Sequence, residues 1–161
     1  YLTSGFLAAL ISHLVDGAGL PDALRACMAV LTQHKGSAET AAKLEQALRL
    51  PASGTLVPAA VEQLGQGWVA DEALAISVYC ALKHPGDFRA AVVASVNHSG
   101  DSDSTGCITG AIAGASLGVD EIPPPWVNGI EDYDRIKKLA VDLFRVSRAG
   151  AELSQEEYPP D

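Results

Sequence analysis

Residues 96–118 read VNHSGDSDSTGCITGAIAGASLG, and this stretch decides the fold. It joins an acidic turn, rich in glycine and serine, to a segment with glycine at every fourth position. The segment after the turn predicts a helix from about residue 104 to residue 118. Two aspartates therefore stand at the start of a helix that carries few large side chains.

Helical periodicity extends over nearly all of the 161 residues, and no segment shows the sustained alternation of a strand. We expect further helices at about residues 2–17, 21–36, 37–50, 71–84, 87–97 and 129–148, and a short one within 53–67. In the last helix we expect these residues to face inward: Ile130, Tyr133, Ile136, Leu139, Ala140 and Leu143. The sequence predicts an all-α protein, with one domain over residues 1–150 and a mobile acidic tail over residues 151–161.

The composition limits the partners and the compartment. Twenty acidic residues outnumber 11 basic ones, and no basic cluster interrupts this balance, which argues against nucleic acid or an anionic membrane as the main partner. The longest apolar run, residues 107–119, is shorter than the ~20 residues that span a bilayer. Cys27, Cys80 and Cys107 lie far apart in apolar helical segments, so we expect buried free thiols in the reducing cytoplasm.

Two interpretations of the acidic turn are open. In the first, Ser102, Asp103 or Ser104 caps the helix while Asp101 makes a local turn. In the second, Asp101, Asp103 and Ser104 direct three oxygen ligands at one cation, Mg²⁺, Mn²⁺ or Ca²⁺. An EF-hand loop is excluded, because its twelfth position requires a bidentate glutamate and this chain has Ile112 there.

The glycines of the following helix share one face, because they are four residues apart. They are Gly106, Gly110, Gly114 and Gly118. Each glycine inside a helix costs roughly 0.5–1 kcal/mol relative to alanine. We therefore expect another helix or a ligand to approach this face closely.

Segments along nearly the whole chain resemble one family. NHSGDSDSTGCITGAIAGASLG (97–118) is similar to the C-terminal motif of the ADP-ribosylglycohydrolases, the dinitrogenase-reductase-activating type of hydrolase. LGVDEIPPPW (117–126) is similar to the segment that ends this motif, and LGQGWVADEAL (64–74) resembles the family's Gly-x-Gly-Trp-Val-Ala-Glu-Glu-Ala-Leu segment. YLTSGFLAALI (1–11) resembles the helix that follows the family's mid-chain histidine motif.

The resemblance implies a compact multi-helix orthogonal bundle with a binuclear Mg²⁺ or Mn²⁺ site. It also implies hydrolysis of the bond between ADP-ribose and a protein side chain, with ADP-ribosylated protein or ADP-ribose as the ligand. Carried over by position, Asp101 would ligate one metal ion, Asp103 would bridge both, and Ser104 would add its hydroxyl. Gly67, Trp68 and Val69 match a loop that lines the adenosine pocket, so Trp68 is a candidate stacking surface.

The family pattern also contains an Asp-Asp motif, a glutamate and a substrate-binding histidine that would precede Tyr1. The chain therefore resembles the C-terminal half of such an enzyme, and we expect the other half to come from the same gene or from a second chain. No catalytic acid or base is assigned within this chain. Glu72 is interpreted as an exposed or capping carboxylate, and His98 as a hydrogen-bonded histidine or one that supports the metal ligands. The alternative function is a non-catalytic relative, either ADP-ribose-binding or structural, or an inactive fragment, that keeps the fold without turnover.

Overall fold

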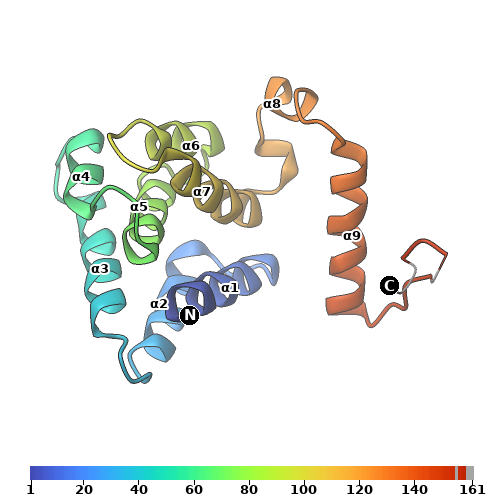
Figure 1. The fold of residues 1–161 in the computed structure, drawn as a ribbon, viewed down its shortest axis with the longest axis horizontal. Coiled ribbons are helices and arrows are strands. Elements are labelled where there is room, and N and C mark those ends of the chain that lie inside the picture. The colour runs from blue at the N-terminus through green and yellow to red at the C-terminus, as the bar shows by residue number, and fades with distance from the viewer. Residues whose placement is uncertain (155, 159–161) are drawn as a thin grey trace. The chain divides into compact units, whose positions relative to one another are not determined.

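The computed structural model describes residues 1–154 and 156–158, and Figure 1 shows their arrangement. These residues form helices and connecting turns and include no strand, so the predicted all-α class is confirmed. The α-helices are α1 (Leu2–Val15), α2 (Leu20–Leu31), α3 (Ala38–Arg49), α4 (Val57–Leu64), α5 (Ala70–Lys83), α6 (Phe88–Val96), α7 (Ser102–Leu117), α8 (Pro124–Asn128) and α9 (Tyr133–Ala149). Two short 3-10 helices are η1 (Leu50–Ala52) and η2 (Val119–Glu121).

The chain divides into two compact units, Tyr1–Pro123 and Pro124–Asp161. In the first unit, α5 contacts α1, α3, α4, α6 and α7, and nine of its 14 residues are buried. A helix that is apolar on all sides is stable only when other helices surround it. The first turn of α5 is therefore held in a fixed position, and this turn lies directly after the predicted adenosine loop. In the described part of the chain, no helix has the length and apolar character needed to cross a membrane.

Helix α7 begins at Ser102, two residues earlier than predicted. Its N-cap is Asp101, whose Oδ1 accepts a hydrogen bond from the Ser104 N–H at 3.3 Å. The expectation that Ser102, Asp103 or Ser104 caps this helix is therefore wrong. An aspartate satisfies a free N–H of the first turn well, and here the cap comes one residue before the predicted candidates.

The glycines of α7 have unequal surroundings, although their spacing is equal. A Cβ on Gly106 would lie 2.7 Å from Val96 Cγ1 of α6, so the expected close packing is confirmed there. A Cβ on Gly114 would make only ordinary contact with Phe88, and one on Gly110 would find no atom within 4 Å. Gly118 ends the helix with a φ of +88°. Close packing therefore explains the first glycine of the stripe and not the whole stripe.

The cysteines differ in burial. Cys27 and Cys80 are buried free thiols, as predicted, and burial raises the pKa of both, that of Cys80 to about 12. Cys107 is exposed, and its predicted burial is wrong. The reason is its position on α7, since Asp103 and Ala111, one turn before and after it, are exposed too.

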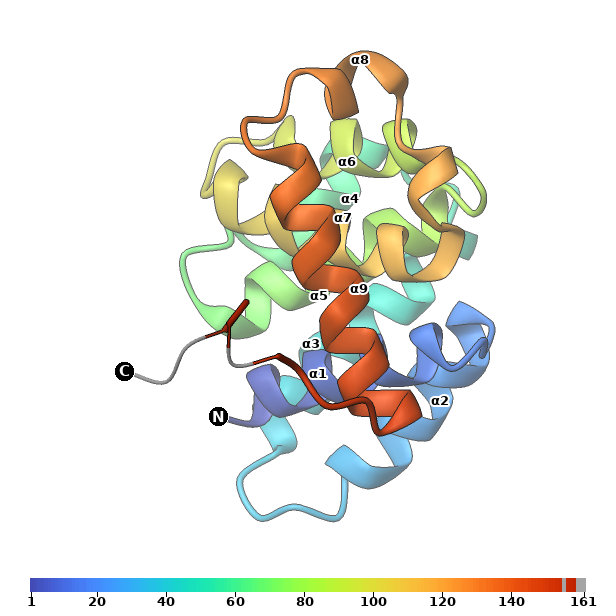
Figure 2. The same cartoon turned by 90° about the vertical axis from the view of Figure 1, so that its right-hand side faces the viewer.

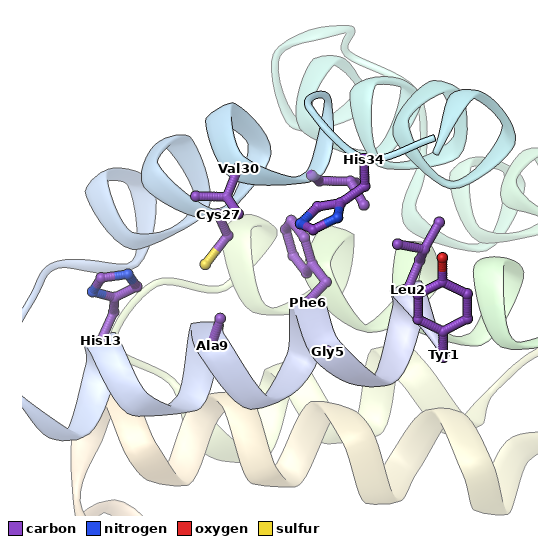
Figure 3. Close-up of a pocket in the computed structure, with 10 residues that line it drawn as sticks. Tyr1, Leu2, Gly5, Phe6, Ala9, His13, Cys27, Val30 and His34 are labelled. Carbon is purple, nitrogen blue, oxygen red and sulfur yellow. The ribbon is translucent and has the colours of Figure 1, made fainter. Parts of the chain in front are cut away.

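A groove of about 250 Å³ lies between α1 and α2, and Figure 3 shows its lining. Phe6 and Ala9 lie on α1, and the Cys27 side chain points toward them from α2. His13 and His34 also line the groove. Among the residues that the structure describes, no carboxylate lines this groove, so it differs in chemistry from the acidic turn.

The second unit consists of α8, the long helix α9 and the residues after it, which are coloured orange to red in Figure 2. Of the α9 residues, only Asp142 is buried, so the expectation that Ile136, Leu139 and Leu143 face a core is wrong within this unit. The same applies to Ile130, Tyr133 and Ala140, none of which is buried. The physical reason is that this unit has few other elements to cover the apolar side of α9.

The residues after α9 include the segment predicted as a mobile acidic tail, 151–161, of which 155 and 159–161 lie outside the described residues. The Tyr158 hydroxyl donates a hydrogen bond to Asp142 Oδ2 at 2.8 Å, and Lys138 Nζ donates to the same oxygen at 2.6 Å. Lys138 also forms an ion pair with Glu157 at 3.2 Å. The hydrogen bond from Lys138, together with that from Tyr158, lowers the pKa of Asp142. The segment around Tyr158 thus contacts α9.

Candidate functional site

The acidic turn places two carboxylates and one hydroxyl at the start of α7. Asp101 and Ser104 are half-buried, and Asp103 is exposed. A hydrogen bond with the Asp103 side chain lowers the pKa of Asp101 most, and hydrogen bonds with Ser104 lower it further. Asp103 and Ser104 also border a shallow hollow with Cys107 and Ile108. The two aspartates are therefore close neighbours, and one of them is open to a ligand.

His98 and Thr105 form hydrogen bonds that stabilise the turn. The Gly100 N–H donates to His98 Nδ1 at 3.1 Å, so the neutral ring carries its proton on Nε2, which lies 3.0 Å from Thr105 Oγ1. Thr105 is fully buried, and its hydroxyl donates to the Ser95 carbonyl at 2.7 Å. His98 is thus a half-buried, hydrogen-bonded histidine that fixes the backbone beside Asp101.

The predicted adenosine loop lies against the acidic turn. The Asp101 N–H donates to the Gln66 carbonyl at 2.7 Å, the residue directly before Gly67. Glycine is required at position 100, because a Cβ there would lie 1.8 Å from the Gln66 oxygen. It is favoured at position 67, where φ is +78° and a Cβ would lie 3.0 Å from Thr105 Cγ2. The structure thus brings together Gly67 and Asp101, which are 34 positions apart in the sequence.

Trp68 and Val69 follow this contact and remain accessible. The indole of Trp68 is 68% exposed and Val69 is 56% exposed, so neither side chain belongs to the core. Val69 is the N-cap residue of α5. An exposed indole beside a fixed backbone contact can offer its ring face to a planar ligand.

Two glutamates, Glu72 and Glu62, hold the site together through hydrogen bonds to other segments. Glu72 Oε2 accepts hydrogen bonds from the N–H groups of Gln66 and Gly67 at 3.0 and 3.1 Å. Glu62, on α4, accepts from the N–H and the hydroxyl of Ser99 at 3.2 and 3.1 Å. Glu62 was not singled out by any motif. For Glu72 the sequence offers one indication, since glycines at positions 65 and 67 leave space for a side chain beside the loop.

The donor set of the turn fits a hard divalent cation. Two carboxylates and a hydroxyl are the oxygen ligands that Mg²⁺ and Mn²⁺ prefer. The ion pairs in the described part of the chain involve acids other than Asp101 and Asp103. Within residues 1–154 and 156–158, no three side chains of His, Cys, Asp or Glu form a metal-binding group. The turn therefore supplies a partial set of ligands.

Comparison with known proteins defines the class. A sequence model of the ADP-ribosylglycohydrolase family matches residues 1–152, and the chain belongs to this family. The resemblance seen in the motifs is thereby confirmed.

Particular relatives match shorter segments. The chain is 33% identical to human ADP-ribosylhydrolase ARH3 over 96 residues, which cover 53% of this chain and 26% of that protein. It is 40% identical over 58 residues to ADP-ribosylarginine hydrolase Tri1 of Serratia proteamaculans, which cover 36% of this chain and 16% of Tri1. It is 41% identical over 44 residues to ADP-ribosyl-[dinitrogen reductase] glycohydrolase of Rhodospirillum rubrum, which cover 27% of this chain and 15% of that enzyme. The chain thus matches about a quarter or less of the length of each of these relatives.

Proposed function

We propose that this chain carries part of the active site of a hydrolase that releases ADP-ribose from modified protein side chains. The observation that carries the proposal is the 2.7 Å hydrogen bond between Asp101 and Gln66, because it joins the acidic turn to the loop of Gly67, Trp68 and Val69. The loop that carries the exposed indole of Trp68 is thereby linked to the turn that carries the proposed cation ligands. Membership of the family and the names of its relatives support ADP-ribose as the ligand.

In this proposal the acidic turn would help to hold two Mg²⁺ or Mn²⁺ ions. Asp101 would ligate one ion, Asp103 would serve both, and Ser104 would contribute its hydroxyl. The N–H of Ser104 orients the Asp101 carboxylate, which reduces the freedom that this ligand would lose on binding. Bound cations of this kind polarise hydroxyl groups and lower the pKa of a bound water.

Trp68 would stack on the adenine ring, and Gly67 and Val69 would shape the backbone beside it. Stacking of a base on an aromatic side chain contributes about 1–3 kcal/mol per base. Trp68 can make this contact without unpacking any core, because its indole is largely exposed.

The remaining groups would come from an N-terminal half of the domain, supplied by the same gene or by a second chain. They would include the other metal ligands and the general acid or base, which is not assigned within this chain. Breakage of the bond to ribose develops oxocarbenium character, which nearby carboxylates stabilise. The cytoplasm remains our prediction for the compartment, from the acidic composition and the free thiols.

The test is Asp103→Asn in the full-length gene product. We expect release of ADP-ribose from a modified protein to fall by at least ~100-fold, because a neutral amide is a weaker ligand for a hard cation. Asp120→Asn is the matched control, since Asp120 is an exposed acid in η2, and this variant should keep full activity.

Three outcomes are informative. Full turnover in Asp103→Asn would overturn the proposal. Binding of ADP-ribose and Mg²⁺ in calorimetry, with no turnover by the wild-type protein, would instead support a non-catalytic relative. Loss of activity in Asp120→Asn as well would show that the effect is not specific to the turn.

A further inference from the structure

The Glu72 carboxylate binds the backbone of the loop that precedes its own helix. One oxygen, Oε2, accepts from two successive N–H groups, those of Gln66 and Gly67. The side chain needs the space that a glycine leaves, because a Cβ on Gly65 would lie 2.2 Å from Glu72 Cδ. Gly65 also has a φ of +124°, a conformation that other residues rarely adopt. The loop is thus built around this carboxylate.

Glu72 does not act as an ordinary helix cap. It is the third residue of α5, and in a capping box a glutamate at this position accepts from the N–H of the N-cap residue, which is Val69 here. Glu72 instead accepts from residues two and three positions before the N-cap. Its hydrogen bonds therefore fix the loop, and the interpretation of Glu72 as a simple capping carboxylate does not account for them.

The peptide groups of Gln66 connect Glu72 to the acidic turn. The N–H of Gln66 is bound to Glu72, and its carbonyl accepts from the Asp101 N–H at 2.7 Å. The turn has a separate support at Ser99, whose N–H and hydroxyl both donate to Glu62. Glu72 therefore sets where the loop lies against the turn, whereas Glu62 holds the turn alone.

We propose that Glu72 is a positioning residue that holds the Gly67–Val69 loop in register with the Asp101–Ser104 turn, so that nucleotide and cation are bound by one unit. This inference rests on the proposed function. Since Oε2 already accepts two N–H groups, Glu72 acts through the loop backbone and not on the reacting atoms. Its loss should weaken nucleotide binding more than it slows the chemical step.

The experiment compares Glu72→Ala, Glu72→Gln and Glu39→Ala in the full-length gene product. Glu39 is a matched control, because it is an exposed glutamate in the first turn of α3. We expect Glu72→Ala to raise the KM for the ADP-ribosylated substrate by about 10–100-fold, with a smaller fall in kcat. Glu72→Gln should recover most of the affinity, because its amide oxygen can still accept the two N–H groups.

Hydrogen exchange of the backbone amides gives a readout that does not depend on activity. Glu72→Ala should speed exchange at Gln66 and Gly67 and also at Asp101, while Glu39→Ala should leave all three unchanged. An unchanged exchange rate at Asp101 in Glu72→Ala would overturn the positioning role. So would changes in KM and kcat that are the same in Glu72→Ala as in Glu39→Ala. Absence of turnover in the wild-type protein would count against the proposed function, and the exchange rates would still decide the role of Glu72.

Discussion

The glycines near the start of α7 and those further along it differ in how closely other atoms approach them. Gly100, two residues before the helix, and Gly106, near its start, stand where a Cβ would collide with a neighbour, at 1.8 Å from Gln66 and 2.7 Å from Val96. Further along, Gly110 and Gly118 have no atom within 4 Å of a Cβ position. Crowded glycines lie beside the candidate site, and glycines with free space lie away from it. Regular spacing alone therefore does not identify a contact face.

Gly100→Ala should have the largest effect on stability. Its Cβ would overlap a backbone oxygen, which cannot move without breaking the hydrogen bond from Asp101 to Gln66. We expect a loss of about 2–4 kcal/mol in the free energy of unfolding. Thermal unfolding should show a midpoint lower by ~5–15 °C. A variant as stable as the wild type would mean that the loop and the turn are not in contact.

Gly106→Ala should be milder. The colliding atom is a side-chain methyl of Val96, which lies partly exposed at the end of α6 and can rotate. We expect a destabilisation of about 1–2 kcal/mol, measured by denaturant unfolding. Val96→Ala in the same chain should relieve it. A loss as large as that in Gly100→Ala would contradict the distinction between backbone and side-chain crowding.

Gly110→Ala should stabilise the chain. Its Cβ would enter open space, and alanine in the middle of a helix is favoured over glycine by about 0.5–1 kcal/mol. The measurement is again the free energy of unfolding in denaturant. A destabilised variant would mean that another segment packs closely against Gly110. Gly110 would then be crowded, as Gly106 is.

The last prediction concerns the reactivity of the three cysteine thiols and involves no expected change in stability. A thiol reagent at pH 8 should modify Cys107 rapidly in the folded chain, while Cys27 and Cys80 should react only after unfolding. Cys107→Ser should abolish the fast reaction. Fast modification of Cys80 would contradict its burial and its raised pKa.

Much of the fold could be predicted from the sequence, because helical periodicity reports burial of one helix face. The predicted segments 71–84 and 87–97 agree closely with α5 and α6. Periodicity gave wrong predictions of burial where no other element of the same unit covers the apolar face of the helix. The apolar residues of α9 have helical spacing and are not buried in their unit, and Cys107 lies in an apolar segment on an exposed side.

The candidate site was only partly predictable. The proposed oxygen ligands Asp101, Asp103 and Ser104 lie within four positions of the sequence. Their spacing left a helix cap and a cation site both open, and the family resemblance favoured the cation site. The contact between Gln66 and Asp101 joins distant segments, and no local pattern encodes it. The roles of Glu62 and Glu72 depend on backbone N–H groups, which every residue other than proline carries, so residue types did not reveal them.

The single peptide linkage at Gln66 has a thermodynamic consequence. If the loop binds the nucleotide and the turn binds the cations, then ordering either segment lowers the cost of ordering the other through the hydrogen bond to Asp101. Coupling of this kind is reciprocal, so the factor by which Mg²⁺ tightens nucleotide binding must equal the factor by which nucleotide tightens Mg²⁺ binding. Nucleotide and Mg²⁺ would then bind cooperatively, and either ligand alone would bind weakly.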